Sequence, residues 1–414
     1  MFNRMVFRKL KCENKIFIQT YFSGYKSDVE KDMLQIDALK KEIEDYSINF
    51  GLKNDKTLRK IFRLLELYIN HYKLIAMDEL LQRISDTCKE LRNESTWYIK
   101  YIQMLGFCRY KQYRFREALT LFLEQESIVG GESDILCENI GHTYSSLGEY
   151  ENAIRYFNKG ISICGDSITP YRKAGFLYGL SLATDRLGDT SKALPLLHKA
   201  LDGYSQGSNY DETTIAKVKS SISHMHEKLG NVDESIKYSE DSLKHFRKTV
   251  GNESPLTITA AGDLGKLWFK KHDYEHARPL LHEALIGESK KDAFQIDDTF
   301  NIIHTLKQLH MKHKINGKEP TLHDLRSGFS PYLPHLQVSL SRAEKVVGTS
   351  NKHGDVAALF KVVGEVLILS GDYRASIPAF SKAIDYLKYV KNVDTSELTL
   401  QCQQLLAIAQ NNIT

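Results

Sequence analysis

The feature of this sequence that most constrains its fold is an internal repeat. Its clearest copy covers residues 136–164, where Gly141, Gly148 and Ala153 mark a first helix, a turn and a second helix. Self-alignment places the small residue of the second helix at Ala118, Ala153, Ala193, Ser235, Ala277 and Ser376, in steps of 35, 40, 42, 42 and 99 residues. Such a period is typical of stacked two-helix units, because one unit cannot bury its own apolar face.

Small residues recur at fixed places in each unit, and packing explains why. The small residue of the first helix lets the two helices approach, and the alanine twelve residues later is expected to face it across the pair. The glycine between the helices is expected to adopt a left-handed conformation that ends the first helix. The predicted structural positions are Gly106, Ala118, Gly141, Gly148, Ala153, Gly188, Ala193, Gly230, Gly265, Ala277, Gly364 and Gly371.

The six copies of this skeleton resemble the tetratricopeptide repeat family over about residues 97–391, and the 40–42-residue steps are similar to the long-repeat subtype of kinesin light chains. The resemblance implies an all-α fold. We expect a right-handed superhelical solenoid of about seven to eight antiparallel helix pairs, with a C-terminal capping helix. It also implies a scaffold that binds another protein and catalyses no reaction.

The repeat divides the chain into segments with different expected structures. Residues 28–96 are expected to form N-terminal helices that include a divergent repeat, and residues 97–293 the regular array. Residues 294–350 are expected to form a degenerate repeat, with helices near 297–313 and 333–347 and an inserted polar loop over 314–331. The last repeat is expected over 351–393 and the capping helix within 394–414, over residues 396–411.

The first 27 residues differ in charge from the rest of the chain. They hold six basic residues and one acid, a balance of +5, whereas the remaining residues sum to −1. Basic residues mixed with bulky apolar ones resemble a mitochondrial targeting presequence (transit peptide). We therefore expect a mitochondrial protein, in the matrix or associated with the inner membrane. The alternative is a cytoplasmic protein with a basic tail.

Composition and motifs argue against several other classes. No run of about 18 uninterrupted apolar residues is present, so we expect no integral membrane segment. Six scattered cysteines without a CxxC pair indicate small buried side chains. The pairs His272/His276 and His310/His313 lack a third ligand at fixed spacing, and no phosphate-binding glycine loop or nucleophile elbow occurs. We therefore expect no catalytic residue, cofactor or metal site.

In a stack of this kind the first helices line a concave groove, and helical periodicity selects the side chains that face it. A groove that mixes aromatic rings, histidine and both charge signs suits a peptide or a helix. The predicted partner-binding residues are Lys100, Gln103, Phe107, Tyr110, Glu138, His142, Tyr178, Asp185, Ser220, His224, Lys266 and Phe269. Chaperone-tail-binding members of the family place Lys and Asn in slots that hold other residues here, so we do not expect that ligand.

These observations favour a non-catalytic mitochondrial scaffold, such as an assembly or biogenesis factor, that binds a protein or peptide partner. A cytosolic adaptor like the kinesin light chains is the first alternative, although residues 28–49 supply only about three heptads of coiled coil. An organellar RNA-binding helical repeat is the second alternative. The charge of −1 over residues 28–414 disfavours it, so we expect no nucleic-acid partner.

Overall fold

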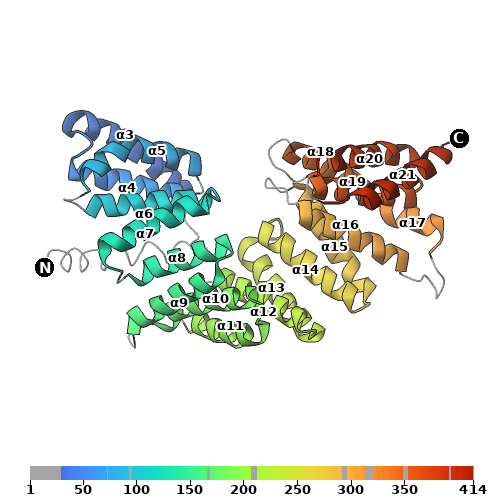
Figure 1. The fold of residues 1–414 in the computed structure, drawn as a ribbon, viewed down its shortest axis with the longest axis horizontal. Helices are drawn as coiled ribbons and strands as arrows, with labels where there is room; N and C mark the ends of the chain where they lie inside the picture. The colour runs from blue at the N-terminus through green and yellow to red at the C-terminus, as the bar shows by residue number, and fades with distance from the viewer. Residues whose placement is uncertain are drawn as a thin grey trace. The chain divides into compact units, whose positions relative to one another are not determined.

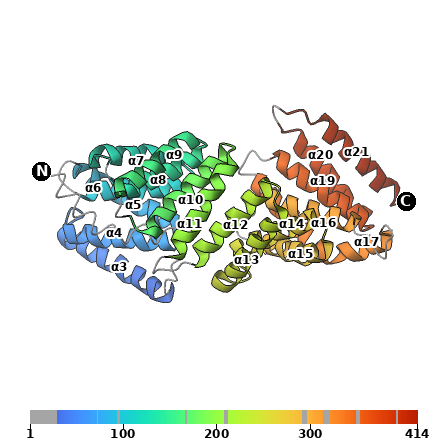
Figure 2. The ribbon, with the colours of Figure 1, turned by 90° about the horizontal axis from the view of Figure 1, so that it is seen from below.

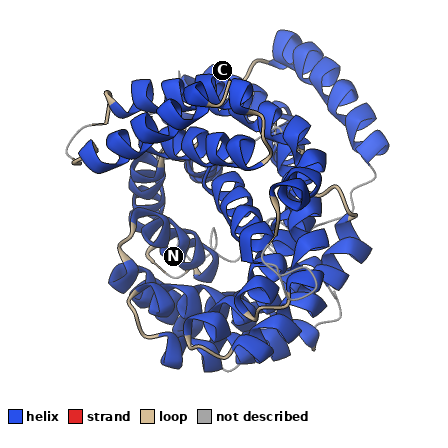
Figure 3. Ribbon diagram, turned by 90° about the vertical axis from the view of Figure 1, so that its right-hand side faces the viewer, coloured by secondary structure: helices blue, strands red, loops and turns tan. Residues whose placement is uncertain are grey.

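The computed structural model describes residues 29–71, 73–92, 96–131, 133–165, 168–206, 212–290, 296–312, 320–347, 353–390 and 393–413. Every regular element within these ranges is helical (Figure 3). The chain divides into two compact units, Met1–Leu229 and Gly230–Thr414, called unit 1 and unit 2 below. The predicted class, an all-α helical-repeat solenoid, is confirmed. The predicted presequence, residues 1–27, lies outside the described residues.

From Val29 on, where its description begins, unit 1 has three helices and continues as a row of helical hairpins (Figure 1). The opening helices lie close to the residues expected for them. They are α3 (Val29–Phe50), α4 (Asp55–Asn70) and α5 (Leu74–Glu90). The hairpins are α6 (Thr96–Lys111) with α7 (Phe115–Val129), α8 (Asp134–Leu147) with α9 (Tyr150–Cys164) and α10 (Pro170–Arg186) with α11 (Thr190–Ser205), followed by α12 (Glu212–Lys228).

Unit 2 has the same construction, with one insertion (Figure 2). It begins with α13 (Val232–Val250), α14 (Pro255–Lys270), α15 (Tyr274–Lys290) and α16 (Ile296–Lys312). It continues with α17 (Leu322–Phe329), a short 3-10 helix (Ser330–Tyr332), α18 (Leu333–Val347), α19 (His353–Leu369), α20 (Tyr373–Leu387) and α21 (Ser396–Asn411). The expected helices at 297–313, 333–347 and 396–411 correspond to α16, α18 and α21.

The turn between the two helices of a hairpin uses a left-handed residue, as predicted. Gly148, Gly188, Gly230 and Gly371 have φ angles of 80°, 92°, 81° and 77°. Tyr113 and His272 occupy the same place, five residues before the buried alanine, with φ angles of 61° and 64°. Two turns therefore hold a non-glycine residue in a conformation that strains it.

The first-helix glycines pack closely against large side chains of the second helix. A Cβ atom at Gly106, Gly141, Gly265 or Gly364 would lie 2.7–2.8 Å from the side chain sixteen residues later, which is Phe122, Phe157, Leu281 or Phe380. That the alanine twelve residues later faces the glycine across the pair stays a prediction. Ala118, Ala153, Ala193 and Ala277 are fully buried. The glycine makes room for a ring or a leucine, and the alanine fills the remaining core.

The inserted segment is only partly the loop that the sequence predicts. Residues 314–319 lie outside the described residues, but α17 forms where the rest of the loop was expected. Thr321 and Asp324 form a capping box at the start of α17, and Phe329 at its end is buried. Arg326 Nε donates to the Ser370 carbonyl oxygen at 3.0 Å, which fixes α17 to the end of α19. These caps and contacts make a short polar segment helical.

Candidate functional site

The predicted partner-binding residues all lie on first helices of hairpins. We define the first-helix wall of unit 1 as the solvent-facing sides of α6, α8, α10 and α12, and that of unit 2 as those of α14, α16 and α19. Ten of the twelve residues lie on the first helices of unit 1, and Lys266 and Phe269 lie on α14 of unit 2. Their contact with a partner stays a prediction.

The α6 part of the wall combines aromatic rings with lysines. Lys100 Nζ lies 5.1 Å from the centre of the Trp97 ring, and Lys111 Nζ lies 5.6 Å from that of the half-buried Phe107. Gln103 is buried, so it contributes to packing more than to an open surface. The Tyr110 hydroxyl is 3.0 Å from Ser146 Oγ on α8, which joins two successive first helices.

The α8 and α10 parts are joined by an arginine between two carboxylates. Arg172 Nε donates to Asp134 Oδ2 at 2.9 Å, and Arg172 Nη1 donates to Glu138 Oε2. The guanidinium also lies 4.6 Å from the centre of the Phe176 ring. Glu138 is only 4% exposed, so its carboxylate pairs with Arg172 and is not accessible to a ligand. Sequence analysis missed Arg172. Its positive charge on the first helix that follows the one with Glu138 could have indicated an ion pair between the two helices.

His142 is half-buried on the same wall, with its ring edge-on to the ring of Phe157 at 5.1 Å. Burial lowers the pKa of His142 below its ordinary value, and the charges of Arg172 and Lys111 lower it further, against the opposing effect of Glu138. The imidazole is therefore neutral at pH 7. A neutral imidazole offers one hydrogen-bond donor and one acceptor to a ligand.

The α10 and α12 parts are joined by two polar contacts. The Tyr178 hydroxyl is 3.3 Å from Ser221 Oγ, and Lys228 Nζ donates to Asp185 Oδ2 at 2.6 Å. Burial raises the pKa of Asp185, but hydrogen bonds from Lys228 and Thr190 outweigh it, and the pKa is lowered overall. Asp185 thus holds helices together as a charged group. Of the remaining predicted residues, Ser220 is half-buried and His224 is exposed.

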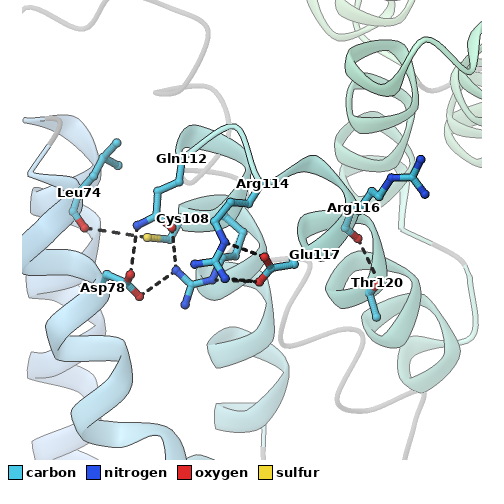
Figure 4. Close-up of polar contacts among 9 residues, drawn as sticks. Leu74, Asp78, Cys108, Gln112, Arg114, Arg116, Glu117 and Thr120 are labelled. Carbon is cyan, nitrogen blue, oxygen red and sulfur yellow. Dashed lines mark hydrogen bonds and ion pairs between the residues drawn. The ribbon is translucent and has the colours of Figure 1, made fainter. Parts of the chain in front are cut away.

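A polar network joins α6 to α5, the last of the three opening helices (Figure 4). Arg109 Nη1 on α6 donates to Asp78 Oδ1 on α5 at 2.9 Å and to Gln112 Oε1 at 2.7 Å. Gln112 Nε2 also donates to Asp78 Oδ2 at 3.1 Å. Arg114 donates twice to Glu117 at the start of α7. Arg109 thus joins α6 to α5 by a hydrogen bond, and its Nε also lies 3.7 Å from Glu117 Oε2 on α7.

The wall of unit 2 begins with the last two predicted residues on α14. Lys266 Nζ pairs with Asp263 at 2.6 Å, and Phe269 lies against Lys312 Nζ at 5.6 Å. The wall continues on α16 and α19 with Lys307, Lys361 and Glu365, which sequence analysis missed. The 99-residue step between anchors hid the repeat that holds α16, and the groove prediction was not extended to α19, the first helix of the last repeat.

The described residues contain no cluster of three or more His, Cys, Asp or Glu that could hold a metal ion, and no helix with the length and hydropathy needed to cross a membrane. Burial raises the pKa of Cys108 and Cys137 to about 11, so these thiols stay protonated near neutral pH. Both behave as core side chains.

Repeated hairpins with small residues at fixed places define a helical-repeat protein. Residues 136–167 and 214–285 match models of the tetratricopeptide repeat. The chain therefore contains tetratricopeptide repeats in these two stretches, as its pattern predicts. Its assignment to the kinesin-light-chain-like subtype stays a prediction.

Bacterial proteins are among those similar to this chain. The chain is 23% identical over 274 residues to response regulator aspartate phosphatase E of Bacillus subtilis, which covers 63% of this chain and 69% of that protein. The apo form of the quorum sensor NprR from B. thuringiensis has a TM-score of 0.58 and 14% identity, over 87% of this chain and all of that one. NprR in complex with its cognate peptide NprX has a TM-score of 0.50 and 16% identity, over 78% and 91% of the two chains. These structural likenesses show the fold.

Proposed function

We propose that this chain is a non-catalytic scaffold that binds a peptide or a helix along its first-helix walls. The observation that carries the proposal is the set of contacts between successive first helices of unit 1. Tyr110 with Ser146, Arg172 with Glu138, and Tyr178 with Ser221 join α6, α8, α10 and α12 in turn. A wall held this way is preorganised, which lowers the entropy cost of binding.

The composition of the wall supports a peptide ligand. Aromatic side chains at Phe107 and Tyr178 are half-buried, so they offer apolar area at a small cost in side-chain entropy. His142 and the lysines of α6 add hydrogen-bond donors around them. The solved complex of NprR with its cognate peptide NprX is consistent with such a use of this fold.

Site-specific photo-crosslinking tests the proposal. The full chain would carry p-benzoylphenylalanine at position 107 or 178, and a matched control would carry it at exposed Lys199 on the second helix α11. After irradiation in cells, mass spectrometry would identify the attached peptides. We expect one set of peptides at positions 107 and 178 and none of it at position 199. Equal labelling at all three positions would contradict a binding role for the wall.

We further propose that the scaffold works in mitochondria, in the matrix or at the inner membrane, as an assembly or biogenesis factor. This proposal depends only on the basic character of residues 1–27. A fluorescent protein fused to the C-terminus would test it. A mitochondrial signal that is lost when residues 1–27 are removed is expected, and diffuse fluorescence of the intact fusion would reject the location.

A second candidate function comes from the curated relative. The alignment with response regulator aspartate phosphatase E favours a partner that is a response regulator, and hydrolysis of its aspartyl phosphate. Incubating the full chain with a response regulator labelled with radioactive phosphate separates the two functions. Binding without faster loss of label supports the scaffold, whereas faster loss supports the phosphatase.

A further inference from the structure

Three charged side chains meet where α16 and α19 pack together in unit 2. Lys307 Nζ on α16 lies 2.5 Å from Glu365 Oε2 on α19, and Lys361 Nζ lies 3.1 Å from Glu365 Oε1. The side chains of Lys307, Lys361 and Glu365 are only 15%, 20% and 19% exposed. Each oxygen of the Glu365 carboxylate therefore pairs with one lysine ammonium group, and the cluster is partly shielded from solvent on the first-helix wall.

The charges of this cluster do not cancel. Two ammonium groups share one carboxylate, which leaves a net charge of +1 among Lys307, Lys361 and Glu365. Within the described ranges, neither lysine forms an ion pair with any other acid. Each ammonium has three N–H donors, and Glu365 uses one of them. A half-buried excess charge is unfavourable unless an anion accompanies it.

The neighbouring side chains are neutral hydrogen-bonding groups. His304 Nε2 is 2.7 Å from Gln308 Nε2, and the imidazole stacks on Phe300 with 5.7 Å between ring centres. Burial lowers the pKa of His304, and the charges of Lys307 and Lys361 lower it further, while Glu365 has the opposite effect. The imidazole is thus uncharged at pH 7, so the excess positive charge stays with the lysines.

We propose that Lys307 and Lys361 bind a carboxylate of the peptide ligand, either an acidic side chain or the C-terminal group. This inference rests on the proposed function and adds the chemistry of one ligand group. A monoanion matches the net charge of +1 and accepts two charge-assisted hydrogen bonds, one from each lysine. A dianionic phosphate would instead carry more negative charge than the cluster can balance beside Glu365.

The test uses small probes and the nuclear magnetic resonance signal of His304 in the full chain. N-acetylglycine represents a C-terminal carboxylate, and the α-amide of N-acetylglutamate represents an acidic side chain. The α-amide of N-acetylglutamine is the neutral control, and inorganic phosphate is the competing anion. A His304→Gln variant assigns the signal. We expect a saturable shift with a carboxylate probe and none with the neutral control.

Variants separate a binding site from a structural ion pair. Lys361→Gln leaves Glu365 paired with Lys307, and it is expected to weaken carboxylate binding about tenfold. Glu365→Gln raises the net charge of the cluster and is expected to strengthen binding. Lys345→Gln, at an exposed position on α18, is the matched control and should bind as the wild type does. A purely structural ion pair would give no response to carboxylate in any of these variants.

The outcomes also distinguish this inference from the proposed function. An unmoved His304 signal, or tighter binding of phosphate than of carboxylates, overturns the carboxylate site but leaves peptide crosslinking at positions 107 and 178 intact. A carboxylate response lost in Lys361→Gln supports the site even if crosslinking fails. The carboxylate probe that binds more tightly shows whether the ligand supplies a C-terminal carboxylate or an acidic side chain.

Discussion

Gly364 lies against the ring of Phe380, and a Cβ atom at position 364 would come within 2.7 Å of that ring. Phe380 is fully buried, so its ring has little room to move. We expect Gly364→Ala to lower the free energy of unfolding by about 1–3 kcal/mol, because overpacking strains the core.

The same helix provides a control for this prediction. A Cβ atom at Gly354 would meet Val390 at an ordinary distance of 3.7 Å. Gly354→Ala is expected to raise the free energy of unfolding by up to about 1 kcal/mol, since alanine favours a helix more than glycine does. Urea unfolding followed by circular dichroism measures both changes. Equal effects of the two substitutions would contradict the packing argument.

The left-handed turn residues predict stabilising substitutions. Tyr113 and His272 occupy a position that glycine fills in four other turns, with φ angles of 61° and 64°. Tyr113→Gly and His272→Gly should each raise the free energy of unfolding by about 0.5–1 kcal/mol, because they relieve backbone strain. Gly148→Ala should have the opposite effect. Thermal melting of the three variants checks the signs, and a stabilising Gly148→Ala would refute the explanation.

Removal of the Arg172 side chain is expected to lower the free energy of unfolding strongly. Glu138 is 4% exposed and would be left without its cation, so Arg172→Met should lower the free energy of unfolding by about 3 kcal/mol. The double variant Arg172→Met/Glu138→Gln should recover part of this loss, because no buried charge remains unbalanced. Chemical denaturation of the wild type, Arg172→Met, Glu138→Gln and the double variant forms a double-mutant cycle. A double variant less stable than Arg172→Met would contradict the assignment.

His142 predicts a pH dependence of stability. Burial lowers its pKa below the ordinary value of 6.5, against Glu138 and together with Arg172 and Lys111. As the pH falls below about 6.5, the unfolded chain takes up a proton at this residue before the folded chain does. Stability should therefore decrease as the pH falls below 6.5, and less steeply in His142→Asn. Denaturation curves across this range test the prediction, and parallel curves for the two proteins would count against it.

The helices and their turns followed from local patterns. Gly141, Gly148 and Ala153 predicted a first helix, a left-handed turn and a second helix, and the structure has α8, a turn with φ of 80°, and α9 there. Local sequence suffices because a helix and its end depend on neighbours within a few residues. Helix α17 was missed because its stability depends on contacts with a distant turn at Ser370.

The candidate site was harder to predict than the helices. Periodicity placed Glu138 and Asp185 on a first helix correctly, but it carried no information that each is paired with a residue 34 or 43 positions away. For the same reason it missed Lys307 and Glu365, which are 58 positions apart. An ion pair between helices depends on how those helices pack, and no local spacing records that.

The amino-acid order alone determined that this chain is a series of helical hairpins. The turn glycines and the small residues set where each helix ends and how closely it packs, and this depends on residues close in the sequence. Only the tertiary structure decided which polar side chains pair with another helix and which can still bind a ligand. The physical reason is that burial and pairing depend on atoms brought together from separate repeats, and their charges gain or lose solvation only once the helices are stacked.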